Sequence, residues 1–290
     1  MTATTTGELA LEVLRRNATA FAEHAPRSRG GGDAEDVHQT RVATRRLRAA
    51  LRVFRDVLPP EVGALKEDLS WIASLLGPVR DLDVQVRRLQ SIAVELGLSQ
   101  VLIPYGAWLE EQRQRATAAF VQAFESGRFG SLTEHLRQLD TLTFDWPNDG
   151  PLKDQAPRRL RRAFRQFSKR ADGLHQSSPA IDFHQARIRA KRLRYAVEFF
   201  ESVYGKSARR LTKTATDLQD LLGEHQDGIV STQHIHEAIQ TVAATWPAET
   251  SLALGQVVQH EAPRGEKLRR QFKPVYRDVT DAWRRLRRDF

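Results

Sequence analysis

The sequence repeats itself at a fixed offset of 146 residues. The segment His38–Arg48 (HQTRVATRRLR) recurs as His184–Arg194 (HQARIRAKRLR), and Leu75–Asp81 (LLGPVRD) recurs as Leu221–Asp227 (LLGEHQD). Upstream, Leu14, Arg15, Arg16 and Phe21 fall on Leu160, Arg161, Arg162 and Phe167 in the same register. Three separate blocks that share one offset predict a duplicated structural unit.

The hydrophobic periodicity is helical nearly throughout, and no segment alternates apolar and polar residues as a strand does. We therefore predict an all-α fold, a duplicated helical bundle whose two halves are related by a pseudo-two-fold axis. The halves are residues 1–146 and 147–290, joined by the turn-rich segment Asp145–Pro151, and the glycine run Gly30–Gly32 precedes the second helix. The expected helices cover 7–25, 36–57, 61–76, 81–96, 104–126, 128–141, 153–172, 182–204, 207–222, 227–244 and 250–286, the last broken near Pro263 and Pro274.

The repeated glycines and aspartates predict where helices begin and end. Asp36 and Asp182 precede each repeated histidine by two residues and are suited to be N-caps of the basic helices. Gly77 and Gly223 stand where a helix would end in a left-handed residue. Four residues later, the repeated aspartates of the LLG…D segments would cap the next helix.

Basic residues are concentrated in three short segments. Residues 37–55 contain six, 158–170 seven and 183–197 five, without any Asp or Glu. The three segments together carry a charge of +18, whereas the whole chain has a net charge of +9. The rest of the chain therefore carries 9 − 18 = −9. Like charges at i and i+4 destabilise a helix by roughly 0.2–0.5 kcal/mol per pair. We interpret these segments as the binding surface of a polyanion; the alternative is an ordinary solvated face.

The basic residues of each repeat fall on one side of a helix turning by ~100° per residue. In the first repeat this stripe consists of His38, Arg41, Arg45, Arg48 and Arg52. In the second it consists of His184, Arg187, Lys191 and Arg194, with Glu198 at the position of Arg52. A third basic helix carries Arg158, Arg161, Arg162, Arg165 and Lys169. Arginine predominates, and its planar guanidinium matches phosphate bidentately.

The two histidines and one aromatic residue extend this hypothesis. His38 and His184 are expected in the first turn of their helices, where free amides attract phosphate. We expect them to take up protons when a polyanion binds. Tyr195 lies beside the second stripe and is the one aromatic residue there that could contact the ligand; the tryptophans are not interleaved with the stripes.

Several chemistries have no support in the sequence. The chain has no cysteine, which excludes disulfides and thiol catalysis, and we see no secretory signal and no apolar run long enough to span a membrane. A metal site at His225, His234 and His236 is disfavoured because residues i and i+2 of a helix face different ways. We predict no metal, no cofactor and no catalytic constellation; the oligomeric state is not indicated.

The paired H-x-x-R-x-x-x-[RK]-R-L-R helices, their duplication and the LLG…D segments resemble the CHAD family, the histidine-marked α-helical domain, over roughly residues 8–285. The resemblance implies two helical bundles around a basic cleft or pore that binds inorganic polyphosphate. It also implies association with polyphosphate granules in some members, and no established catalytic activity. By position, the family's basic motif falls on His38, Arg41, Arg45, Arg46 and Arg48, and on His184, Arg187, Lys191, Arg192 and Arg194.

Inorganic polyphosphate is therefore the predicted ligand, and we expect it to be bound without catalysis. The expected location is the cytoplasm, where polyphosphate granules are one site at which the protein could reside. Nucleic-acid binding is the first alternative, although no nucleic-acid-binding motif is present. A polyphosphate-processing phosphohydrolase is the second alternative, although it would need acidic metal ligands that the basic helices lack.

Overall fold

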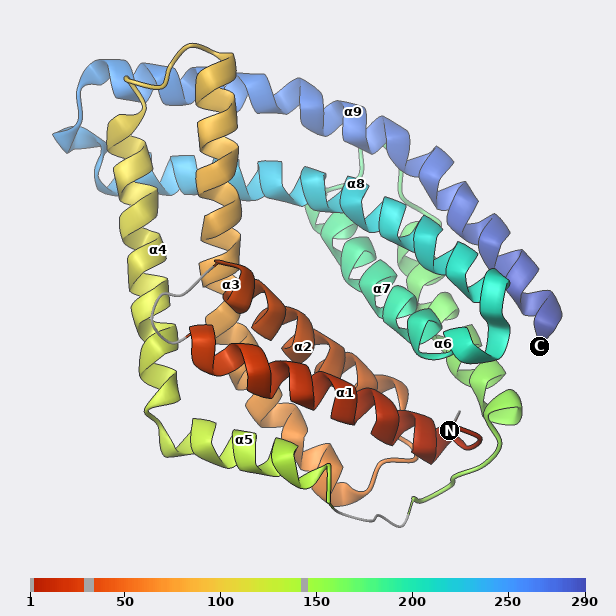
Figure 1. The fold of residues 1–290 in the computed structure, drawn as a ribbon. Coiled ribbons are helices and arrows are strands. Elements are labelled where there is room, and N and C mark those ends of the chain that lie inside the picture. Colours follow the sequence, from red (N-terminus) through yellow and green to blue (C-terminus); the bar gives the residue numbers. More distant parts are fainter. Residues whose placement is uncertain (1–2, 29–33, 142–145) are drawn as a thin grey trace.

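The computed structural model describes residues 3–28, 34–141 and 146–290, and these residues are almost entirely helical (Figure 1). The main helices are α1 (Thr6–Arg27), α2 (Ala34–Val53), α3 (Pro60–Glu95), α4 (Ile103–Phe124), α5 (Gly127–Gln138), α6 (Leu152–Ala171), α7 (Ala180–Phe199), α8 (Glu201–Thr241) and α9 (Ala248–Leu286). No β-sheet occurs within the described part of the chain, so the predicted all-α fold is confirmed. Gly30–Gly32 and Asp145 lie outside the described residues.

The helices pack as neighbouring pairs in chain order. The pair α3 and α4 crosses the pair α8 and α9 at one end of the molecule, while α1 and α2 lie beside α6 and α7 at the other (Figure 1). The crossing encloses a small apolar core that includes Leu89, Tyr105 and Leu254. The larger core includes residues of all nine helices given above and draws on both halves of the chain.

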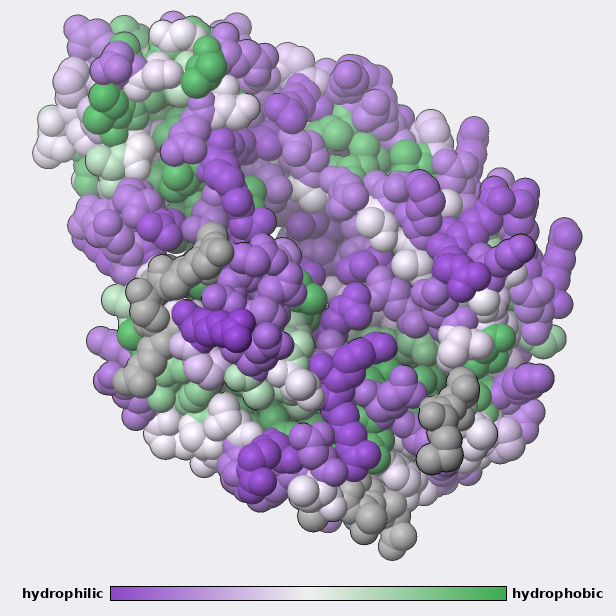
Figure 2. All heavy atoms as spheres, viewed as in Figure 1, coloured by the Kyte–Doolittle hydropathy of each residue, from purple (hydrophilic) through white to green (hydrophobic). Residues whose placement is uncertain are grey.

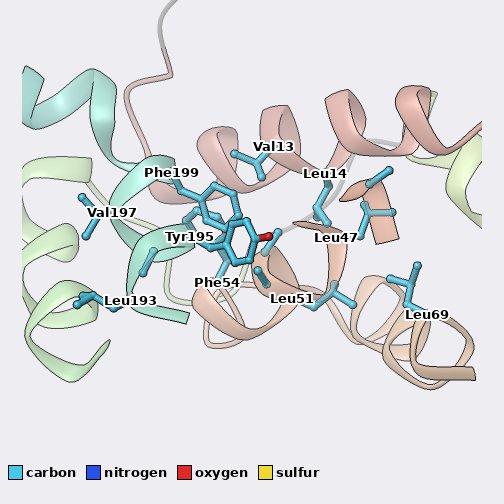
Figure 3. Close-up of a cluster of buried hydrophobic side chains, with 14 of the residues drawn as sticks. Val13, Leu14, Leu47, Leu51, Phe54, Leu69, Leu193, Tyr195, Val197 and Phe199 are labelled. Carbon is cyan, nitrogen blue, oxygen red and sulfur yellow. The ribbon is translucent and has the colours of Figure 1, made fainter. Parts of the chain in front are cut away.

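The apolar face of α2 is central to this larger core. Leu47 and Phe54 are fully buried, as the helical wheel predicts, because the cationic stripe occupies the opposite side of the helix. Phe54 stacks on Phe199 at the end of α7, with 5.7 Å between the ring centroids (Figure 3). Apolar burial thus fixes α2 against α7 and determines which way their charged faces point.

The predicted helix ends at Gly77 and Gly223 are wrong. α3 continues through Gly77 and Pro78, and α8 continues through Gly223, with its single non-helical residue at Gly205. Glycine in a helix interior costs about 0.8–1.0 kcal/mol, which continued burial of the flanking leucines outweighs. Asp81 and Asp227 are therefore mid-helix residues and not N-caps. α9 also runs unbroken through its two prolines, contrary to prediction.

The basic helices start earlier than predicted. α7 begins after Pro179, which provides no side-chain cap, so Asp182 lies within the first turn instead of capping it. Asp36 likewise lies inside α2, where its carboxylate contacts His24 Nδ1 at 2.8 Å. His38 and His184 are consequently the fifth residues of their helices, one turn away from the free amides expected to attract phosphate.

Several features follow the repeat offset of 146. α1 and α6 begin at Thr6 and Leu152, and α2 and α7 at Ala34 and Ala180. The segments before α1 and α6 exchange two backbone hydrogen bonds: Thr6 N donates to Gly150 O at 3.0 Å, and Leu152 N donates to Thr4 O at 3.1 Å. Such reciprocal bonding between equivalent positions is what a two-fold axis produces. The superposition of whole halves and the division into two domains stay predictions.

Candidate functional site

Four cationic side chains, two from each repeat, converge where α2 faces α7. They are Arg41 and Arg45 of α2 and Arg187 and Lys191 of α7, which occupy equivalent positions and are here called the central cluster. All four are partly buried, and each lies near enough to others of the group to affect their ionisation. Figure 2 shows a hollow lined by hydrophilic side chains in the middle of this view, in the region where α2, α3, α7 and α8 meet in Figure 1.

Lys191 carries the clearest electrostatic signature. Burial, reinforced by the charges of Arg187, Arg45 and Arg41, lowers the pKa of Lys191 to about 7. Burial is also the main reason that the pKa values of Arg41 and Arg187 are lowered. A cation that is disfavoured by both desolvation and like charge is stabilised when an anion arrives.

Two carboxylates offset part of this charge. Asp81 of α3 lies 3.3 Å from Arg41 Nη2, and Asp227 of α8 lies close to Arg187. Burial raises the pKa of Asp227, which weakens it as a counter-ion. The four basic side chains outnumber these two carboxylates, although Asp220 also acts on Arg187, and Lys191, whose pKa is about 7, is only partly charged at pH 7.

The cluster also holds unused hydrogen-bond donors. The Nε–H groups of Arg45 and Arg187 are buried and have no hydrogen-bond partner within the described part of the chain. Leaving such a donor unsatisfied costs about 1–3 kcal/mol. Both groups therefore favour an acceptor-rich ligand.

The repeated histidines lie at the two sides of the cluster in different surroundings. His38 lies near Arg80, and its pKa is lowered mainly by burial and also by the Arg80 charge. His184 instead places Nδ1 2.9 Å from Oε1 of Gln226, the residue equivalent to Arg80. The pKa of His38 therefore lies below the usual range of an imidazole, and its proton uptake on ligand binding stays a prediction.

Arg46 and Arg194 lie in a neutralised environment. Glu198 contacts both, at 3.3 Å and 2.6 Å respectively, and Arg194 also donates to Gln219. The Tyr195 ring lies beneath Arg45, Arg46 and Arg194 and is only 3% exposed, so it supports these guanidinium groups from within the core. Its buried ring does not offer the ligand-contacting surface that the sequence suggested.

Arg52 of α2 and Arg192 of α7, both predicted site residues, border a pocket of about 290 Å³ with α6. We call it the arginine pocket. Its walls are Arg52, Val53, Arg55, Asp56, Arg158, Arg159, Arg162, Ala163, Gln166, Arg189, Arg192 and Ala196. Arg48 lies next to Arg52 and Arg192 and raises the local charge further. Burial and these neighbours lower the pKa of Arg192 to about 10, so it stays charged at neutral pH.

The third basic helix is only partly directed at the site. Arg158 and Arg162 of α6 line the arginine pocket, whereas Arg161, Arg165 and Lys169 do not. Arg161 lies over the Phe290 ring at 5.1 Å, and all three side chains are exposed. Their assignment to the ligand stays a prediction.

Sequence reasoning missed several residues near these sites. Arg80 lies beside His38, and Arg55, Arg159 and Arg189 line the arginine pocket. A signal for Arg80 was present, because it belongs to the repeated LLGPVRD block. The charge counts also missed that acids outside the basic segments, such as Glu198 and Asp81, neutralise some of the arginines.

Other chemistries find no support in the described ranges. No group of three or more His, Cys, Asp or Glu side chains that could hold a metal occurs among the described residues. His225 accepts a hydrogen bond from Arg269 Nε at 3.0 Å, and burial lowers the pKa of His225 to about 4. No described helix combines the length and apolar character that a membrane crossing requires.

Fold and site together define a class of protein: an all-helical chain in which two basic helices with a common sequence motif meet in one cationic site. The sequence profile of the CHAD domain matches residues 12–236, well over half of the chain. The chain therefore belongs to the CHAD domain family.

Two curated relatives from Mycobacterium tuberculosis, the uncharacterized protein MT2285 of strain CDC 1551 / Oshkosh and the uncharacterized protein Rv2226 of strain ATCC 25618 / H37Rv, are 30% identical over 270 residues. The alignments cover 88% of this chain and 50% of each relative. The chain thus spans about half the length of the curated relatives that it matches.

Two solved structures share the fold. The CHAD domain from the plant Ricinus communis superposes with a TM-score of 0.67 at 29% identity, covering 94% of this chain and 88% of that one. PptA from Streptomyces chartreusis superposes with a TM-score of 0.72 at 19% identity, covering 97% and 100%. The second likeness shows the fold alone.

Proposed function

We propose that this protein binds inorganic polyphosphate without catalysing a reaction, and that the ligand lies on the central cluster. The observation that carries the proposal is the convergence of Arg41, Arg45, Arg187 and Lys191, partly buried and with buried donors unsatisfied. Charge-assisted hydrogen bonds to a phosphate chain would supply both the missing charge and the missing acceptors. Membership of the CHAD family supports the same ligand.

The geometry favours polyphosphate over nucleic acid. Proteins that hold single-stranded nucleic acid combine a basic groove with aromatic platforms on which bases stack. Tyr195 is buried, and Trp108 packs against Tyr105 and His234 in the second core, away from the basic faces. A site with guanidinium groups and no exposed aromatic ring at its centre suits an anion without bases.

Competition binding tests this choice. Long-chain polyphosphate and single-stranded DNA, matched for total charge, would compete against a fluorescent polyphosphate at fixed ionic strength. Salt must be fixed because both ligands lose affinity steeply as it rises. Polyphosphate should displace the probe at least tenfold more effectively than DNA; equal potency would contradict the proposal.

The proposal of a purely binding role has its own test. Asp81 and Asp227 lie beside the central cluster, whereas a phosphohydrolase of the two-metal type needs clustered carboxylates that fix its metals. Incubation with polyphosphate and Mg²⁺ or Mn²⁺ should release no phosphate above a no-protein control. Progressive release that the variant Asp81→Asn abolishes would establish an enzyme instead.

Binding to polyphosphate also implies where the protein would be found. We propose a cytoplasmic protein that gathers at polyphosphate granules. Microscopy of the tagged protein, with a granule-staining dye, should show co-localisation that disappears in the variant Arg41→Glu/Arg187→Glu.

A further inference from the structure

The arginine pocket has a counterpart at equivalent positions of the repeat. A second hollow of about 410 Å³ is lined by Leu9, Glu12, Val13, Arg16, Glu198, Phe199, Glu201, Ser202 and Arg209. Seven of these residues lie 146 positions from a residue of the arginine pocket: Glu12, Val13, Arg16, Glu198, Phe199, Glu201 and Ser202 correspond to Arg158, Arg159, Arg162, Arg52, Val53, Arg55 and Asp56. The repeat therefore builds the same pocket twice.

The two pockets carry opposite charge. The arginine pocket is lined by seven arginines and one aspartate, a formal charge of +6. The counterpart pocket is lined by three glutamates and two arginines, a formal charge of −1. Three positions account for most of the difference, because Arg52, Arg55 and Arg158 are replaced by Glu198, Glu201 and Glu12.

The same asymmetry continues into the contact between α2 and α7. On one side Glu198 neutralises Arg46 and Arg194. The equivalent contacts on the other side join Arg52 to Arg192 and to Arg48, which are like-charge pairs. No described carboxylate pairs with Arg48, Arg52 or Arg192, so the repulsion there is uncompensated.

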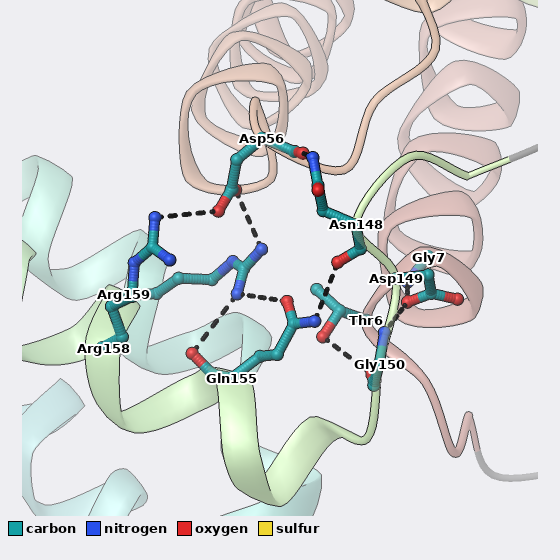
Figure 4. A network of polar contacts seen from close by, with 9 residues as sticks. All are labelled: Thr6, Gly7, Asp56, Asn148, Asp149, Gly150, Gln155, Arg158 and Arg159. Carbon is teal, nitrogen blue, oxygen red and sulfur yellow. Dashed lines mark hydrogen bonds and ion pairs between the residues drawn. The ribbon is translucent and has the colours of Figure 1, made fainter.

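One acid does enter the arginine pocket, but it is already engaged. Asp56 contacts Arg159 at 2.8 Å and Arg158 at 3.7 Å, and Arg159 also donates to Gln155 (Figure 4). This network fixes α6 against the end of α2. Arg52, Arg162, Arg189 and Arg192 remain without a described carboxylate partner around the cavity.

The cationic stripe connects the central cluster to only one of the pockets. From Arg41 through Arg45 and Arg48 to Arg52 it advances eleven residues along α2, about 16 Å at 1.5 Å per residue. The equivalent path along α7 ends at Glu198 and the acidic counterpart pocket. A polyanion therefore meets continuous positive charge in one direction and negative charge in the other.

We propose that the bound polyphosphate extends from the central cluster in one direction only. It follows Arg48 and Arg52 along α2, and its next segment fills the arginine pocket. The counterpart pocket takes no part in binding. This inference rests on the proposed function. It adds that the arginine pocket is occupied only when the polyphosphate chain is long enough to reach it from the central cluster. Tripolyphosphate is too short to occupy the central cluster and the pocket together, whereas a long chain spans both.

Matched variants at equivalent positions test the inference. Arg162→Glu and Arg16→Glu alter equivalent exposed arginines in the two pockets and change the net charge equally. Calorimetry with long-chain polyphosphate should show about tenfold weaker binding for Arg162→Glu and binding within about twofold of wild type for Arg16→Glu. Equal effects of the two variants would overturn the one-sided placement.

A second variant guards against a folding artefact. Arg52→Glu places a carboxylate four residues after Arg48 and opposite Arg192, which is the arrangement that Glu198 already has with Arg194 and Arg46. The variant should fold, as circular dichroism would check. It should bind long-chain polyphosphate about tenfold more weakly than the wild type. The ratio of its affinities for long-chain polyphosphate and for tripolyphosphate should also be smaller than in the wild type. An unchanged ratio would contradict the extension. Failure of the proposed function itself would instead appear as weak binding of polyphosphate to the wild type.

Discussion

The arginine pocket and its counterpart are lined by residues at equivalent repeat positions and differ in the charge of those residues. Arg192 and Arg46 are equivalent, yet Arg192 faces Arg52 whereas Arg46 faces Glu198. One apolar position is kept, where Val53 corresponds to Phe199, whereas Val13 corresponds to Arg159. The sequence repeat thus places two pockets at equivalent positions, and in our proposal a few of their lining residues decide which of them attracts an anion.

The central cluster differs from both pockets because equivalent basic residues of the two repeats meet in it. Arg41 and Arg187 occupy equivalent repeat positions and lie near each other, so their charges add within one site. Charge reversal in the central cluster should therefore cost the most polyphosphate affinity. Reversal in the arginine pocket should cost less, and reversal in the counterpart pocket should have a negligible effect.

The strongest test of this order reverses one charge from each half. Arg41→Glu/Arg187→Glu removes two charge-assisted contacts, each worth about 1.5–3 kcal/mol, and adds repulsion. Polyphosphate affinity should fall at least about a hundredfold, since 1.4 kcal/mol corresponds to tenfold. Arg115→Glu/Arg137→Glu, at exposed sites on α4 and α5, has the same change in net charge and should bind within about threefold of wild type. Similar losses in both variants would mean that overall charge, and not a site, attracts the ligand.

The sequence predicted the parts of this arrangement that depend on local periodicity. The stripe of α2, its buried opposite face and the repeat register follow from spacing alone, because a helix places residues i, i+4 and i+7 on one side. It did not predict that Asp81 would neutralise Arg41 or that Glu198 would bridge Arg46 and Arg194, since these contacts join distant segments. The errors at Gly77 and Gly223 arose because a glycine's modest cost was weighed without the tertiary packing that offsets it.

Stability should separate the two sides of the α2–α7 contact in the absence of ligand. Glu198→Gln leaves Arg46 and Arg194 without their part-buried counter-ion, so the free energy of unfolding should fall by about 1–3 kcal/mol. Arg52→Gln relieves repulsion with Arg48 and Arg192 and should leave the free energy of unfolding unchanged or slightly higher. Urea titrations compare the two variants, and a larger loss for Arg52→Gln would contradict the proposed charge asymmetry.

The smallest expected effect is on proton uptake. Because the pKa of free Lys191 is about 7, Lys191 is mostly neutral at pH 8, and a bound polyanion would raise its pKa and draw in a proton. Affinity should therefore decline as pH rises from 7 to 9, and less so in Lys191→Arg, which keeps its charge. Calorimetry at pH 8 in buffers of different ionisation enthalpy should show uptake in the wild type only. Equal uptake in Lys191→Arg would assign the proton elsewhere, with His38 and His184 the next residues to test.

The most direct test of a site shared by both halves is the affinity and stoichiometry of two single variants, Arg41→Gln and Arg187→Gln. In a shared site each substitution weakens the only tight site, so calorimetry with polyphosphate should give about tenfold weaker binding for both variants at an unchanged number of sites. If each half instead bound polyphosphate independently, each variant would retain the wild-type affinity with half the number of tight sites, and that result would contradict the shared central cluster.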